Sequence, residues 1–183
     1  DYIICHGVYS WVPKEVQAKI LDLCRTCLSP RGVAVVSYNT LPGWRFKSVL
    51  RDIMQLHAQQ FDSPEVRLKK SREFADFIRN ALDARTDAYS KLLKEHIAGI
   101  HTEDSYVTHE YLEEWNEPSY LLDFVAQAHA AGLEHVHDAA YLRTPDLPWP
   151  VEIEQQLATF TTEFLRREQY IDLLTNRTFR SSL

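Results

Sequence analysis

Two short apolar segments flank an amphipathic helix at the start of the chain, and this pattern constrains the fold most. Residues 3–5 and 32–39 are apolar and rich in β-branched side chains, as strands buried in a parallel sheet are. Between them, apolar residues recur at helical spacing after Pro13. They are Val16, Ile20, Leu23, Cys24, Cys27 and Leu28. A strand, a helix and a strand of these lengths predict one right-handed βαβ unit with parallel strands, buried on both faces.

Ligands of such sheets bind beyond the carboxyl ends of the strands. His6 and Gly7 follow the first predicted strand, so His6 is a candidate for facing a cofactor or substrate. Gly7 would let a ligand approach the backbone closely. The alternative is a histidine that only completes a turn; its position favours the functional interpretation. Tyr9 and Trp11 either frame a substrate pocket or pack the start of the helix, and both interpretations stay open.

The second predicted strand ends in an equivalent loop. Asn39 can orient a substrate through its amide, and Trp44 can line the same pocket. The competing interpretation is a turn that only redirects the chain. We expect Asn39 and Trp44 to contact substrate, and Pro42 and Gly43 to shape the turn.

Composition excludes several classes of protein. The net charge is −6, and residues 62–183 hold 22 acidic against 13 basic side chains, which argues against binding a phosphate backbone. No apolar run approaches 18 residues, so no membrane span is expected. Three cysteines in apolar settings fit reduced thiols in the cytoplasm.

Three clusters raise other chemistries. Cys24 and Cys27 have the spacing of a redox or zinc pair, but core packing is the favoured interpretation, since no second pair exists. His135 and His137 could ligate a metal, yet no third ligand is apparent, so no metal site is predicted. Glu110, with Glu113 and Glu114, could receive a substrate ammonium group; a solvated helix face is the favoured alternative.

The remaining chain is mostly helical in pattern. Apolar stripes predict helices over residues 46–61, 74–82, 89–100, 106–115, 119–131 and 153–174. Residues 133–138 alternate like a strand, residues 144–150 form a proline-rich connector, and residues 177–183 are predicted to be a last strand.

Three of these segments resemble class I S-adenosylmethionine-dependent methyltransferases, specifically the bacterial group with a predicted methyltransferase regulatory domain. Residues 1–13 are similar to that group's fourth core strand and following turn, and residues 37–44 to its fifth strand and loop. Residues 109–118, continuing to Gly132, match the signature of the regulatory domain.

The resemblance implies an α/β fold: the C-terminal half of a Rossmann-like class I methyltransferase sheet, in strand order 4-5-7-6, with an α-helical regulatory module. It implies core residues 1–45, a helical regulatory domain over 46–143, and a connector, helix and seventh strand over 144–183. Within the regulatory domain, residues 119–138 could be the last core helix and sixth strand. The family's glycine-rich first motif is absent, so we expect a C-terminal fragment that is inactive alone.

The expected function is that of an S-adenosyl-L-methionine-dependent methyltransferase, with a protein lysine as one possible acceptor. By resemblance, His6 and Gly7 would contact the cofactor, while Tyr9, Trp11, Asn39 and Trp44 would contact the substrate. The alternative is a non-catalytic helical interaction module on a vestigial methyltransferase fold. No nucleic acid or membrane partner is expected. The surplus apolar stripes of residues 46–100 predict a homodimer or a cap over the active site.

Overall fold

The computed structural model describes residues 1–139 and 150–183, and these form two compact units. The first unit combines Asp1–Trp44 with Trp115–Leu183, and the second is Arg45–Glu114. Each unit has a hydrophobic core of its own.

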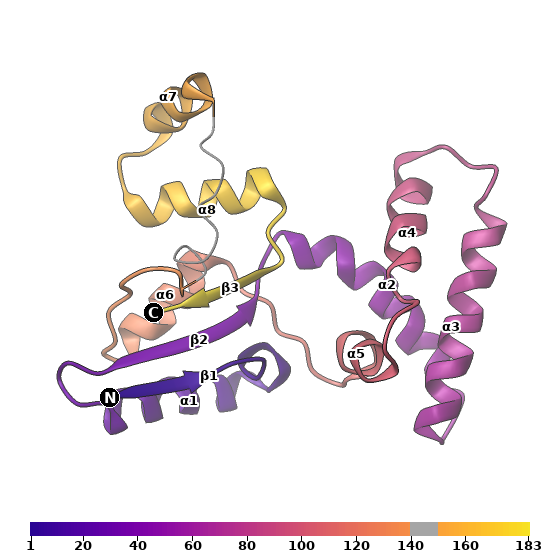
Figure 1. Ribbon diagram of the computed structural model, residues 1–183, viewed down its shortest axis with the longest axis horizontal. Coiled ribbons are helices and arrows are strands. Elements are labelled where there is room, and N and C mark those ends of the chain that lie inside the picture. The colour runs from indigo at the N-terminus through magenta and orange to yellow at the C-terminus, as the bar shows by residue number, and fades with distance from the viewer. Residues whose placement is uncertain (140–149) are drawn as a thin grey trace. The chain divides into compact units, whose positions relative to one another are not determined.

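A three-stranded sheet organises the first unit (Figure 1). β1 (Tyr2–Cys5) pairs in parallel with β2 (Val33–Asn39), and β2 pairs antiparallel with β3 (Phe179–Ser182). The connection from β1 to β2 contains a short 3₁₀ helix, Tyr9–Trp11, and α1 (Lys14–Cys27). The predicted strand–helix–strand unit with parallel strands and the predicted last strand are therefore confirmed.

One face of this sheet is covered by α1 and by α6 (Leu121–Ala130), which meet in a shared core. The Tyr38 and Phe124 rings stack there with centroids 4.1 Å apart. The buried members of this core are Tyr9, Leu21, Cys24, Val36, Tyr38, Phe124 and Ala128. Stacked and edge-on aromatic pairs add to the burial of apolar area, so the sheet and both helices are fixed together.

The buried stripe of α1 differs from the predicted one. Gln17, Leu21 and Cys24 are buried, whereas Val16 and Leu23 are more than 40% exposed and Cys27 is exposed. Cys24 is buried and Ile20 packs against the core as predicted, but Gln17 and Leu21 complete the buried face in place of Val16 and Leu23. The polar Gln17 concealed this stripe, because periodicity searches follow apolar residues.

The predicted burial of β1 on both faces is also wrong for the described residues. Ile3 and Cys5 pack against the core, but Tyr2 and Ile4 are 79% and 71% exposed. Side chains alternate along a strand, so both exposed residues lie on the sheet face opposite α1 and α6.

Residues 133–138 do not form the predicted strand. They lie beside β3 and form one antiparallel bridge with it, between Asp138 and Ser182. In addition, the Val136 N–H donates to the Leu183 carbonyl, and the Leu183 N–H donates to the His137 carbonyl. Gly132, which precedes them, has φ +81° and ends α6 in the left-handed conformation expected of glycine.

The predicted helix over residues 153–174 is two helices, α7 (Val151–Phe160) and α8 (Phe164–Thr175). Thr161 is extended between them, consistent with the low helix propensity of threonine. Most of the predicted connector, residues 144–149, lies outside the described residues. Its last residue, Pro150, is the N-cap of α7.

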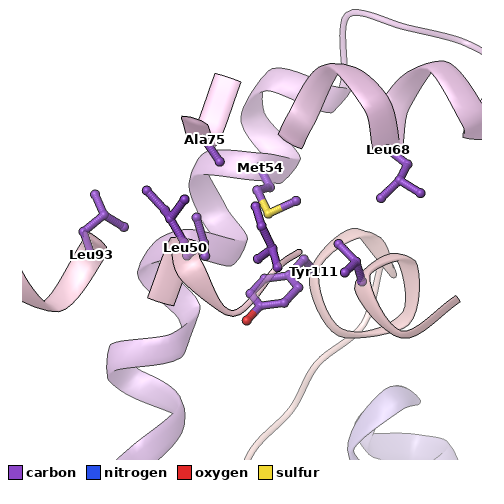
Figure 2. Close-up of a cluster of buried hydrophobic side chains, with 9 residues drawn as sticks. Leu50, Met54, Leu68, Ala75, Leu93 and Tyr111 are labelled. Carbon is purple, nitrogen blue, oxygen red and sulfur yellow. The ribbon is translucent and has the colours of Figure 1, made fainter. Parts of the chain in front are cut away.

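The second unit is helical. It contains α3 (Pro64–Ala81), α4 (Ala88–Ala98), α5 (Asp104–Val107), a π-helical turn (Thr108–Leu112) and most of α2 (Gly43–Ala58). Figure 2 shows side chains of these helices converging on Leu50 and Met54. The other buried members of this core are Leu68, Ala75, Leu93, Ile97, Ile100, Val107 and Tyr111. Among the described residues, no helix combines the length and the apolar character needed to cross a membrane.

Candidate functional site

The carboxyl end of β1 leaves its backbone open. Gly7 has φ +70°, a conformation that glycine adopts without strain, and its N–H donates to Ser37 Oγ at 2.8 Å. A Cβ placed on Gly7 would meet nothing within 4 Å. His6 is exposed, and its ring lies edge-on to Phe179 with centroids 5.9 Å apart. Both predicted cofactor-contacting residues are thus accessible to a ligand.

Tyr9 lies in the core rather than at an open surface. Its hydroxyl donates to Gln127 Oε1 at 3.2 Å, and its carbonyl accepts from Gln17 Nε2 at 2.9 Å. Burial raises the pKa of Tyr9 to about 12, so the phenol stays neutral at physiological pH. In this position Tyr9 can orient two glutamine side chains.

The carboxyl end of β2 is covered by residues 116–119, the crossing segment. Asn39 is buried, and its Nδ2 donates to Asn116 Oδ1 at 3.0 Å. The Asn39 carbonyl accepts from Ser119 N–H at 3.0 Å, and Thr40 forms a parallel bridge with Ser119. The Asn39 side chain therefore orients the crossing segment.

The crossing segment also reaches the loop after β1. Glu117 N–H donates to the Ser10 carbonyl at 2.7 Å, while Ser10 Oγ accepts from the Asn39 N–H at 2.8 Å. Ser10 is buried. One serine thus joins the end of β1, the end of β2 and the crossing segment, which sets their spacing.

Trp11 and Trp44 pack edge to face, with ring centroids 5.7 Å apart. Trp44 is buried and Trp11 is half-buried. Gly43, just before Trp44, lets the backbone after α8 approach closely, because a Cβ there would lie 2.4 Å from the Arg177 carbonyl oxygen. The structure therefore brings Trp11 and Trp44 together, whereas His6 packs against Phe179.

Sequence reasoning missed the crossing segment as part of this site. In the sequence, residues 116–118 indicate only that a helix is interrupted. Asn116 and Glu117 contact residues more than 70 positions away, and such contacts leave no local pattern. The acidic residues just before them lie in the second unit. There Glu110 forms an ion pair with Lys47, and the Glu113 carbonyl accepts from Gln55 at 2.6 Å. No cluster of three or more potential metal ligands occurs in the part of the chain that the structure describes.

Comparison with known protein families identifies a regulatory domain in the C-terminal part of the chain. Residues 103–183 match the model of the predicted methyltransferase regulatory domain. The match begins within the second unit and continues through all of the first unit after Trp115. The regulatory domain expected from the sequence motifs is therefore confirmed over residues 103–183.

Two relatives of similar sequence come from the bacterium Rickettsia prowazekii. Over its whole length the chain is 38% identical to the uncharacterized protein RP789 of Rickettsia prowazekii, of which it covers 33%. Over 70% of its length it is 45% identical to RP028 of the same organism, of which it covers 52%. The chain thus spans a third to a half of the length of these relatives.

Solved structures of PKMT2 from Rickettsia typhi are similar along the whole chain. One has a TM-score of 0.83 at 38% sequence identity, and one, in complex with AdoHcy, has a TM-score of 0.81 at 39% identity. The chain covers 34% of each. The chain is therefore similar in fold and sequence to part of a methyltransferase.

Proposed function

We propose that this chain is the C-terminal part of the catalytic sheet, with its regulatory domain, of an S-adenosylmethionine-dependent methyltransferase that acts on protein lysine. The observation that carries the proposal is the likeness, at 39% identity along the whole chain, to PKMT2 in complex with AdoHcy. AdoHcy is what S-adenosylmethionine becomes after it gives up its methyl group. PKMT abbreviates protein lysine methyltransferase, which makes lysine the proposed acceptor.

His6 and Gly7 fit one wall of a cofactor cleft. A cofactor needs backbone that it can approach closely, and Gly7 offers open space where any other residue would carry a Cβ. When bound, S-adenosylmethionine supplies an electrophilic methyl group. The part played by this chain is to hold the acceptor in line with that group and to exclude water. Trp11, beside Trp44, is the proposed apolar contact for the acceptor.

In this proposal β1, β2 and β3 correspond to strands 4, 5 and 7 of the class I sheet. Residues 134–138 take the position of strand 6, beside β3. The order 4-5-7-6 then follows. The exposed Tyr2 and Ile4 support the proposal, since apolar residues on a sheet face are normally covered, here by another part of the protein.

Isothermal titration of S-adenosylmethionine into the full-length protein tests the function, followed by mass spectrometry of proteins that it modifies in a cell extract. We expect saturable binding and a mass gain of one or more methyl groups on lysine. The isolated 183-residue chain should bind the cofactor weakly or not at all, because it supplies one wall of the cleft. A full-length protein that binds no S-adenosylmethionine would refute the proposal and favour the non-catalytic interaction module.

A further inference from the structure

The loop that follows β1 is attached to β2 by two reciprocal hydrogen bonds to serine side chains. The Gly7 N–H donates to Ser37 Oγ at 2.8 Å, and the Asn39 N–H donates to Ser10 Oγ at 2.8 Å. Ser37 belongs to β2, and Ser10 belongs to the 3₁₀ helix after β1. Both serines are 1% exposed, so water has little access to either hydroxyl. The loop is therefore held to β2 at two points.

The hydrogen bond to Ser37 fixes the backbone at Gly7. Gly7 has φ +70°, and glycine adopts positive and negative φ about equally readily, so its residue type alone does not select this conformation. Ser37 lies 30 positions along the chain and accepts the Gly7 N–H from a neighbouring strand. The Ser37 hydroxyl thus selects, among the conformations open to Gly7, one in which the N–H faces β2.

The other side of Gly7 is open. Gly7 and His6 are both exposed, and a Cβ on Gly7 would meet nothing within 4 Å. If the Ser37 hydroxyl were removed, water could bond to the Gly7 N–H in its place, so the folding free energy should change little. The loop would then lose its single conformation, and a ligand that binds there would have to order it.

We propose that Ser37 is a positioning residue for the cofactor, which holds Gly7 and the adjoining His6 in the geometry that receives S-adenosylmethionine. The proposal rests on the proposed function, in which His6 and Gly7 form one wall of the cofactor cleft. Ser37 is buried in β2 and acts through Gly7. A wall that is already ordered spares the cofactor the entropy of ordering it, so the hydroxyl contributes to cofactor affinity more than to folding.

Isothermal titration of S-adenosylmethionine into the full-length protein and its Ser37→Ala variant tests this role. Loss of one neutral hydrogen bond should weaken cofactor binding about five- to ten-fold. Ser37→Thr keeps the hydroxyl and should restore most of the affinity. Thermal unfolding of each variant checks that the fold is retained, and Ser37→Ala should unfold at nearly the wild-type temperature.

Ser181→Ala is the matched control. Ser181 lies opposite Ser37 in the pairing of β2 with β3, so both side chains are on the same face of the sheet. Within the described ranges, 1–139 and 150–183, the Ser181 hydroxyl forms no hydrogen bond. Its removal therefore deletes the same group from the same face without freeing Gly7, and the affinity for S-adenosylmethionine should equal that of the wild type.

A double-mutant cycle separates action through Gly7 from a general effect on β2. Gly7→Ala makes φ +70° unfavourable without a steric clash, because its Cβ would meet nothing within 4 Å. If Ser37 acts through Gly7, Ser37→Ala should cause no further loss of affinity in the Gly7→Ala protein.

Three results would overturn the positioning role: wild-type affinity in Ser37→Ala, equal losses in Ser37→Ala and Ser181→Ala, or additive losses in the double-mutant cycle. In each of these cases the wild type still binds S-adenosylmethionine, so the proposed function stands. A wild type that binds no S-adenosylmethionine would instead refute the proposed function, and the positioning role with it.

Discussion

Arg180 and Asp172 form a doubly hydrogen-bonded ion pair inside the first unit, with Arg180 Nε 2.8 Å from Asp172 Oδ2 and Arg180 Nη2 2.8 Å from Asp172 Oδ1. Asp172 belongs to α8 and Arg180 to β3. Arg180 Nη1 also donates to Asp138 at 2.9 Å. One side chain of the last strand therefore links α8 and the segment beside β3 to the sheet.

Asp172→Asn should destabilise the protein strongly. The substitution would take the bidentate carboxylate from the buried Arg180 guanidinium, which keeps Asp138 and Glu168 as partners, so the cost should lie toward the lower end of the ~3–5 kcal/mol typical of a broken buried pair. Urea unfolding of the full-length protein measures this cost. Glu163→Gln is the matched control, since its pair with Arg166 is solvent-exposed and should contribute less than ~1 kcal/mol. Equal losses in the two variants would contradict the prediction.

Gly43→Ala should also destabilise the first unit, by about 1–3 kcal/mol, through overpacking. A Cβ at this position would lie 2.4 Å from the Arg177 carbonyl oxygen and 2.6 Å from that of Asn176. These are backbone atoms, so the β2 loop or the α8 end must move. Gly99→Ala is the control, because the nearest atom to its Cβ would be 3.3 Å away. A Gly43→Ala protein as stable as Gly99→Ala would show that the loop yields without cost.

The sequence predicted local structure well because local forces determine it. The βαβ unit follows from periodicity, and Gly132 ends α6 as its residue type indicates. The errors arise where a side chain bonds outside its own helix or strand. Gln17 is buried because the Tyr9 carbonyl accepts its N–H, and Asn39 is covered because Asn116 approaches from 77 positions along the chain. No periodic pattern encodes such pairs, so the crossing segment could not be predicted from the sequence.

His6→Ala should lower methyl transfer by the full-length protein about ten-fold, which corresponds to ~1.4 kcal/mol of barrier, without lowering its unfolding temperature. His6 is exposed at the proposed cofactor wall, so its loss removes little packing. Asn39→Ala should lower both the rate of methyl transfer and the unfolding temperature, since the buried amide also binds Asn116. Steady-state kinetics and thermal unfolding of both variants check this. A wild-type rate of methyl transfer by His6→Ala would show that His6 does not belong to the cofactor site.

The helical second unit should mediate self-association. Leu56 and Phe77 are 70% and 63% exposed, although both lie on helices that contribute to the core of this unit. We expect both side chains to belong to one apolar patch that a second copy covers, since large exposed apolar patches mark protein–protein contacts. We expect a dimer in sedimentation at tens of micromolar, and a monomer for Leu56→Glu/Phe77→Glu.

Val151→Glu is the control for that experiment, because Val151 is 65% exposed but lies in the first unit. Its sedimentation should equal that of the wild type. A wild-type protein that is monomeric at tens of micromolar would rule out the dimer. Unchanged hydrogen exchange of residues 46–100 on cofactor addition would, in that case, also exclude the role of a cap.

The protein should lose stability as the pH falls from about 6.5, and His135 should account for part of the loss. Burial, followed by the nearby charges of Arg180 and His137, lowers the pKa of His135 below the ordinary value. Well above pH 6.5 the imidazole is neutral in both the folded and unfolded states and contributes no pH dependence. Below it, the unfolded chain binds a proton that the folded protein resists, so acid favours unfolding.

His135→Leu should therefore flatten the decrease in unfolding temperature between pH 7 and pH 5. The variant also removes a buried Nε2 that has no hydrogen-bond partner among the described residues, so it should be no less stable than the wild type at pH 5. His129→Gln is the control, because His129 has a side chain that is 72% exposed and should leave the pH profile unchanged. A pH profile identical in wild type and His135→Leu would show that His135 makes no contribution to the acid sensitivity.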